Sequence, residues 1–82
     1  MNERLKFQGR LVVKDKEAKR LKIRIESNRD SLREALDPTA PVNELEESRI
    51  STLGITLAGQ IVEYNNILAE MKAIEKALGT DG

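Results

Sequence analysis

Apolar residues recur at helical spacing along two long stretches of this chain, and a segment that contains both of its prolines separates them. Pro38 and Pro41 each lack a backbone N–H, and each disfavours helical geometry in the residue before it. A single helix is therefore not expected to run through this segment. The pattern predicts one helix that ends at residue 36, a turn over residues 37–43 and a second helix over residues 44–78.

The first stretch fits a heptad repeat, in which apolar side chains occupy the a and d positions. These positions hold Phe7, Leu11, Ala18, Leu21, Ile25, Leu32 and Ala35. Polar residues interrupt the repeat at Arg4, Lys14 and Asn28. Near Gly9 apolar and polar residues alternate, which is also typical of a short strand or an irregular arm. The heptad favours a helix that begins near residue 3, and the alternative is a helix that begins near residue 10.

The second stretch has a heptad repeat of its own, and Gln60 is the polar exception in it. Its apolar core positions are Ile50, Leu53, Leu57, Tyr64, Ile67, Met71, Ile74 and Leu78. Ile61 and Leu68 widen this stripe to one side, as in a helix of a bundle. This pattern predicts a helix that contacts more than one neighbour.

The ends of the second helix also have recognisable sequence signals. Asn43 and Glu46 have the spacing of a capping box, which would satisfy backbone N–H groups at the start of the helix. Gly79 follows the last core position and is a typical residue for ending a helix. Residues 79–82 are then expected to form a frayed tail.

The two helices are predicted to pair as an antiparallel coiled-coil hairpin, so that the chain is one all-α domain over residues 1–82. With a turn at residues 37–43, oppositely charged residues face each other at the rim of the seam. The expected rim pairs are Arg33 with Glu47, Arg10 with Glu70 and Lys6 with Glu75. Asn66 is expected beside Lys14, as a polar layer that helps to fix the register.

A second apolar face on the second helix predicts self-association. Ile55, Val62 and Ala69 recur every seven residues away from the seam, and small residues beside them would let another backbone come close. A dimer that forms a four-helix bundle explains this face, and a few exposed aliphatic side chains on an ordinary surface are the alternative. The predicted interface consists of Gly54, Ile55, Ala58, Gly59, Val62 and Ala69.

Charge is distributed unevenly along the chain, although the formal net charge is zero. Residues 1–36 carry eleven Lys or Arg against six Asp or Glu, and residues 37–82 carry three against eight. Basic residues concentrate in the middle of the first helix, opposite a stretch with few acids. They form a candidate surface for nucleic acid or another partner, and the alternatives are a solvated face or ion pairs with a second subunit. The residues are Lys16, Lys19, Arg20, Lys22, Arg24 and Arg29.

The composition argues against several classes of function. The chain has no Cys and no His, which removes thiolate metal sites, the commonest general base and the commonest transition-metal ligand. No nucleotide-binding glycine pattern or calcium loop is present. The longest charge-free run, residues 50–62, has thirteen residues, whereas a membrane span needs about 20. We therefore expect a cytoplasmic, non-enzymatic protein with no catalytic residues, no metal and no cofactor; binding to a membrane surface through the basic helix is a remote alternative.

A few short elements of the sequence resemble a known group of proteins. They are the stretch Leu36-Asp-Pro-Thr-Ala-Pro-Val-Asn-Glu-Leu, the pair Arg49-Ile50 and the terminal Ala77-Leu78-Gly79. Together they resemble small uncharacterised helical proteins encoded in Mu-like prophages, over roughly the last fifty residues. The resemblance implies an accessory role in a phage or prophage and transfers no functional residue.

These observations predict a helical-hairpin protein that acts as an interaction or regulatory module. Its expected partners are further copies of itself, as a homodimer or a higher oligomer, and an unidentified protein. The alternative is a small nucleic-acid-binding regulator that uses the basic residues of the first helix.

Overall fold

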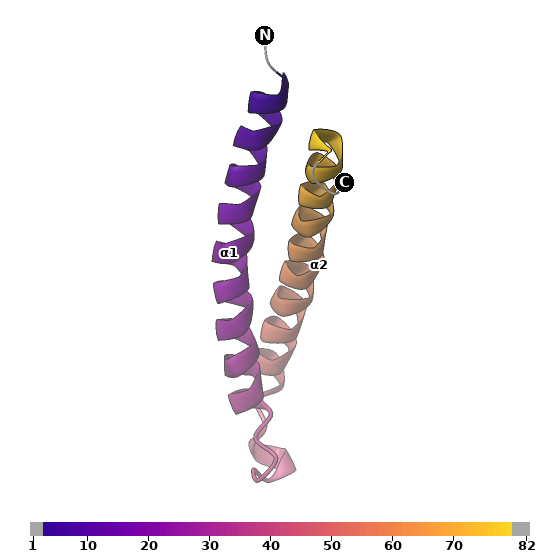
Figure 1. Ribbon diagram of the computed structural model, residues 1–82. Helices are drawn as coiled ribbons and strands as arrows, with labels where there is room; N and C mark the ends of the chain where they lie inside the picture. Colours follow the sequence, from indigo (N-terminus) through magenta and orange to yellow (C-terminus); the bar gives the residue numbers. More distant parts are fainter. Residues whose placement is uncertain (1–2, 80–82) are drawn as a thin grey trace.

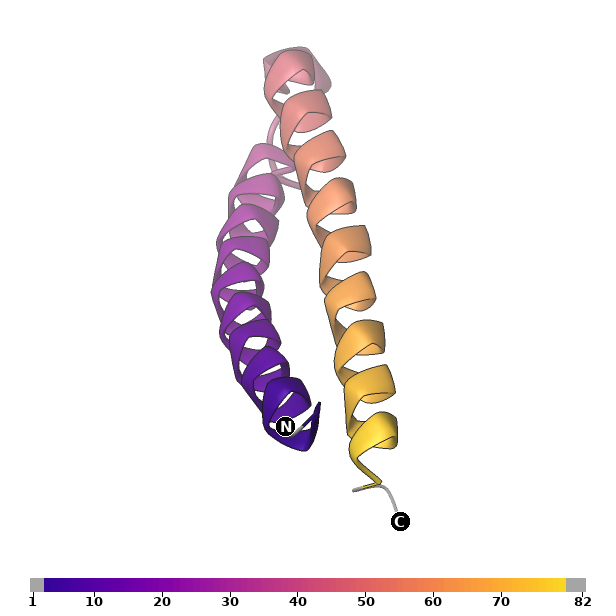
Figure 2. The same ribbon diagram turned by 90° about the horizontal axis from the view of Figure 1, so that it is seen from above.

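The computed structural model describes residues 3–79, and this part of the chain forms a helical hairpin. Its elements are the helix α1 (Glu3–Ala35), the short 3₁₀-helix η1 (Val42–Glu44) and the helix α2 (Glu47–Leu78). The two long helices lie side by side and run in opposite directions in an elongated molecule of 63 × 20 × 15 Å (Figures 1 and 2). The predicted all-helical hairpin is thus confirmed.

The seam between the helices follows the predicted heptads. Within residues 3–79, all six buried residues occupy predicted a or d positions, and the remaining apolar a and d residues are half-buried. Ala18, Leu21 and Ile67 form the central cluster, against which Ile25, Tyr64 and Met71 pack. Among the described residues no large side chain is fully buried, so the core is one narrow stripe.

Helix α1 begins at Glu3, which confirms the earlier of the two predicted starts. Gly9 lies inside the continuous helix, and the strand alternative for this region was wrong. The reason is the seam, because Phe7 and Leu11 are half-buried on the side that faces α2. In addition, the guanidinium of Arg4 donates a hydrogen bond to the backbone carbonyl of Leu78 over 3.2 Å, which joins the open ends of the two helices.

The predicted capping box at Asn43 and Glu46 was wrong. Asn43 lies within the 3₁₀-helix, and α2 begins only at Glu47, without a side-chain cap. Between the two helical segments the backbone is extended at Leu45 (φ −70°, ψ 132°) and Glu46 (φ −90°, ψ 95°). Leu45 is half-buried and lines a hollow together with Ala35, so burial of this side chain delays the start of α2.

The other end of α2 follows the sequence prediction. Gly79 has a φ of 71°, in the left-handed region where glycine has no steric penalty. Its N–H donates to the carbonyls of Glu75 and Lys76, which satisfies the last turn. Residues 80–82 of the predicted tail lie outside the described residues.

The longer connection changes the register of the seam, and the predicted rim pairs were wrong. Glu70 pairs with Lys14, whose Nζ lies 2.7 Å from Oε2, one helical turn further along α1 than the predicted partner Arg10. The hydrogen bond to Glu70 raises the pKa of Lys14. Within residues 3–79, neither Lys6 nor the predicted pair Arg33 and Glu47 forms an ion pair.

The polar layer in the seam also differs from the prediction. Asn66 is exposed and is not the partner of Lys14. Instead the Nδ2 of Asn28 donates a hydrogen bond to the Oε1 of Gln60 over 2.7 Å, and both residues are half-buried. Both of these residues interrupt the apolar heptads, so the seam pairs its polar exceptions with each other.

Substitution in this polar layer gives a first prediction. Gln60→Leu would leave the Asn28 amide without its partner, and we expect the free energy of unfolding to fall by about 1 kcal/mol. Adding Asn28→Leu should restore or exceed the original stability, because two apolar groups then fill the seam. Urea unfolding followed by circular dichroism at one fixed protein concentration measures this. The exposed Gln8 supplies a control, since Gln8→Leu should change stability little; a stabilising effect of Gln60→Leu alone would contradict the prediction.

The turn gives a second prediction, which concerns pH. The backbone N–H and the hydroxyl of Thr39 both donate to the Oδ1 of Asp37, over 2.9 and 2.7 Å, and these bonds lower the pKa of Asp37. The folded form therefore gains stability from the ionised carboxylate at pH values above the pKa of the unfolded chain. That gain disappears as the pH falls through the lower pKa of the folded chain.

An NMR titration of the Asp37 carboxyl carbon tests this directly, and we expect a midpoint below the ordinary 3.8. Thr39→Val removes the hydroxyl and keeps the N–H, so the Asp37 pKa should rise only part of the way back. A midpoint at or above the ordinary value in the unmodified protein would show that the turn does not hold the carboxylate.

Candidate functional site

The most prominent surface feature of the hairpin is a row of exposed apolar side chains on α2. We call it the α2 strip, and it consists of Ile55, Ala58, Ile61, Val62, Leu68 and Ala69. The exposed fraction is 72% for Ile55, 60% for Val62, 43% for Ile61 and 40% for Leu68. Four large aliphatic side chains on one helix thus remain in contact with solvent.

The structure places most of the predicted interface residues in or beside this strip. Ile55, Ala58, Gly59, Val62 and Ala69 are exposed, and only Gly54 is half-buried. A Cβ atom added at Gly54 or Gly59 would meet nothing within 4 Å apart from its chain neighbours and the backbone of its own helix. Packing inside the hairpin therefore does not require glycine at these two positions, and the space beside them is open to another molecule.

Ile61 and Leu68 belong to the α2 strip, although they were not among the predicted interface residues. The sequence pattern placed them at the edge of the seam, as a widening of its apolar stripe. In the hairpin α1 does not cover them, because the helix pair buries only the a and d positions. The extra width of the stripe was the signal for a second contact.

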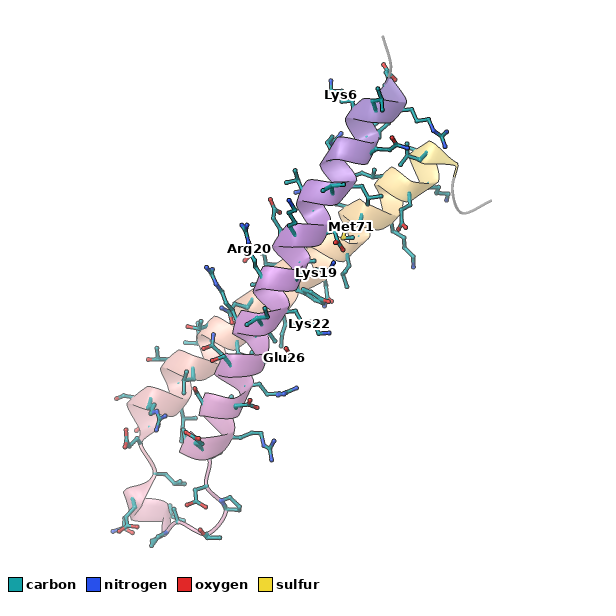
Figure 3. All side chains as sticks on the ribbon, turned by 60° about the vertical axis from the view of Figure 1, so that its left-hand side comes forward. Lys6, Lys19, Arg20, Lys22, Glu26 and Met71 are labelled. Carbon is teal, nitrogen blue, oxygen red and sulfur yellow. The ribbon has the colours of Figure 1, made fainter. Side chains whose placement is uncertain are left out.

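The six predicted basic residues are all exposed, but they do not form a single face. Lys19 and Lys22 lie along one edge of α1, together with Glu26, and Arg20 lies along the opposite edge (Figure 3). Arg24 follows Arg20 by one turn and lines the same hollow, with Glu17 and Glu63. The six residues therefore do not form the single basic face that the sequence led us to expect. Six closely spaced positions extend around most of a helix, so they cannot all lie on one side of it.

Two of these basic residues have acidic partners within α1. The Nζ of Lys19 lies 2.9 Å from the Oδ2 of Asp15, and the Nε of Arg29 lies 3.4 Å from the Oδ1 of Asp30. The hydrogen bond to Asp15 raises the pKa of Lys19. Within the described part of the chain, the other four have no ion-pair partner: Lys16, Arg20, Lys22 and Arg24.

A shallow groove of about 430 Å³ lies between the helices on the Lys19 side. Leu11, Val12 and Met71 supply its apolar surface, and its charged lining residues are Asp15, Lys16, Lys19 and Glu75. The groove shows which edges of the two helices face the same way, because Asp15 of α1 and Glu75 of α2 both border it. Its mixture of apolar and charged groups suits a protein surface better than a small polar ligand.

The described residues contain no candidate metal site. Within residues 3–79, no three His, Cys, Asp or Glu side chains gather where they could hold a metal ion. In the same part of the chain, no helix has the length and apolar character of a membrane span. The chemistry that these surfaces offer is burial of apolar groups and pairing of charges.

Comparison of the chain with protein-family models, curated proteins and solved structures found no match. Its function must therefore be inferred from the surfaces of the hairpin itself.

Proposed function

We propose that this hairpin is a non-enzymatic interaction module that self-associates through the α2 strip. The single observation that carries the proposal is the exposure of four large aliphatic side chains on one helix. Full burial of such a side chain contributes about 1.5–3 kcal/mol, so covering several of them would drive association. A second copy is the expected first partner, and two hairpins would together form a four-helix bundle.

The small core of the hairpin supports the same proposal. A single pair of helices buries one stripe from each, and no large side chain of the described residues is fully buried. Small domains with so thin a core commonly rely on a metal, a disulfide or oligomerisation. The chain has no Cys and no His, which leaves oligomerisation as the available route.

The module would present helix surfaces to a further protein once it has assembled. Ile23 on α1 has an exposed fraction of 67% and lies away from the α2 strip, so it is available to such a partner. The resemblance to prophage-encoded proteins suggests a phage accessory role as the setting, and it adds nothing to the mechanism.

Ile61→Lys tests the self-association. A charge in the middle of the α2 strip should prevent its burial and convert a dimer into a monomer, whereas the helical circular dichroism should persist. Light scattering across a concentration series measures the absolute mass. Val13→Lys is the matched control, since it makes the same kind of change at an exposed site on the Arg20 edge of α1 and should leave the mass unchanged. A monomeric unmodified protein, or a dimer that survives Ile61→Lys, would contradict the proposal.

A second candidate function is binding to a nucleic-acid duplex. The observation that favours it is the group of cations without ion pairs on α1, namely Lys16, Arg20, Lys22 and Arg24 within the described residues. Such side chains can contact phosphates without reading bases. The chain has only one Phe and one Tyr, so it lacks the stacking surfaces that single strands require.

Fluorescence anisotropy with a labelled duplex tests this candidate at several salt concentrations. Binding should weaken as salt rises, and Arg20→Glu with Arg24→Glu should weaken it by about tenfold or more, because two phosphate contacts become repulsive. The control Lys72→Glu with Lys76→Glu changes two exposed cations on α2 and should have a smaller effect. Absence of salt-sensitive binding at low ionic strength would exclude this function.

A further inference from the structure

One side of the hairpin combines the α2 strip with an ordered row of charges on α1. Asp15 and Glu75 border the same groove. Positions seven residues apart share a helix edge, so Lys22 and Arg29 face the same way as Asp15. By the same spacing, Ile61 and Leu68 face the same way as Glu75. Lys19 and Glu26 lie along the same α1 edge as Lys22 (Figure 3).

Two acids and two bases of this α1 edge are arranged antisymmetrically about Lys22. Asp15 and Arg29 each lie seven residues from Lys22 and have opposite signs. Lys19 and Glu26, three and four residues from Lys22, also have opposite signs. A rotation of 180° about an axis through Lys22 therefore places every acid of this edge near a base of a second copy. Such self-complementarity is the property that a two-fold symmetric interface requires.

The α2 strip is centred at the same height in the hairpin. Leu21 and Ile25, on either side of Lys22, belong to the seam cluster that contains Tyr64. Lys22 is thus level with residues 63–64 of α2. Ala58 and Leu68 each lie five residues from residue 63, so the same axis places the small side chain of one copy opposite the large side chain of the other.

We infer that the partner on this side is a second, antiparallel copy of the hairpin, with α1 against α1 and α2 against α2. The two-fold axis crosses both helices at the level of Lys22 and residue 63. This inference rests on the proposed self-association and specifies its geometry. In it Asp15 pairs with Arg29 of the second copy, Lys19 pairs with Glu26 of the second copy, and Ala58 contacts Leu68 of the second copy.

The alternative two-fold arrangement has its axis along the hairpin and is disfavoured by the same surfaces. It would place α1 of one copy on α2 of the other. The α2 strip would then cover the charged α1 edge, and Lys22, Glu26 and Arg29 would lose water without gaining partners. Burial of unpaired charges is far more costly than the apolar contact could offset.

Two details of this arrangement affect how tightly the two copies bind each other. At the axis, Lys22 meets Lys22 of the second copy, and this is the one like-charge contact of the edge. Repulsion between the two side chains lowers the affinity of the dimer. Ile55 and Val62 point away from the seam and lie at the rim of the contact. They are covered in part when two copies assemble, so the whole α2 strip contributes to the contact.

A charge-exchange experiment tests the inference. One variant carries Asp15→Lys with Glu26→Lys, which makes the α1 edge basic; the other carries Lys19→Glu with Arg29→Glu, which makes it acidic. Each variant alone should dimerise about tenfold or more weakly than the unmodified protein, because like charges then face each other. An equimolar mixture should form a heterodimer, which native mass spectrometry distinguishes by mass. Glu17→Lys mixed with Arg24→Glu, on the opposite edge, is the control and should show no preference for heterodimers.

Cysteine cross-linking tests the direction of the helices, and the chain has no native Cys to interfere. Ala58→Cys mixed with Leu68→Cys should form a disulfide-linked dimer under oxidation. Neither variant alone should do so, because each substituted residue lies about 15 Å along the axis from its copy. Efficient cross-linking of either variant with itself would indicate parallel α2 helices and overturn the inference.

The outcomes separate this inference from the proposed function. If the unmodified protein is monomeric at all concentrations, both are wrong. If it is a dimer that both edge variants retain, or if their mixture does not pair, self-association stands and this geometry is wrong. Heterodimers of the two edge variants together with cross-linking of the mixed cysteine pair would establish it.

Discussion

The contact between α1 and α2 along one heptad seam is the interaction on which the rest of the hairpin depends. Every buried residue of the described part of the chain lies in this seam, and its central cluster joins Ala18 and Leu21 to Ile67. The seam holds the two helices side by side, so it also decides which residues share an outer edge. Because it uses only the a and d positions, it leaves the remaining apolar groups of α2 in water. The surface that we propose as functional is thus a direct result of how narrow the core is.

The heptad part of the structure could be predicted from the sequence because it is local and periodic. A repeat of seven specifies the buried face of each helix without knowledge of the partner, and even the polar exceptions Asn28 and Gln60 were recognisable as seam residues. The turn could not be predicted in the same way. Its capping signal at Asn43 was outweighed by the partial burial of Leu45 beside Ala35 at the end of the hairpin, which the local sequence does not specify.

Because the predicted turn was too short, the predicted register of the seam was wrong, and so were the ion pairs that depend on it. A later start of α2 moves all of its residues relative to α1, so Glu70 meets Lys14 instead of Arg10. The candidate surfaces, too, could be predicted only in part from the sequence. The sequence identified most of the α2 strip, since spacing alone places those residues on one helix. It did not separate the basic residues of α1 into two edges, because that requires knowing which side of α1 faces α2.

The register of the seam shows which charges of α1 share an edge, and composition alone does not show this. The unequal charge of the two halves suggests attraction between the helices, yet Lys16, Arg20, Lys22 and Arg24 find no acid within the described part of the hairpin. Along the Lys22 edge, two acids and two bases are placed so that a reversed copy would match them, and the apolar strip lies level with their centre. A random arrangement of surface charges has no reason to share its centre of symmetry with an apolar strip on another helix. This coincidence favours a second copy over an unrelated protein as the partner on that side, and it leaves the Arg20 edge free for a different one.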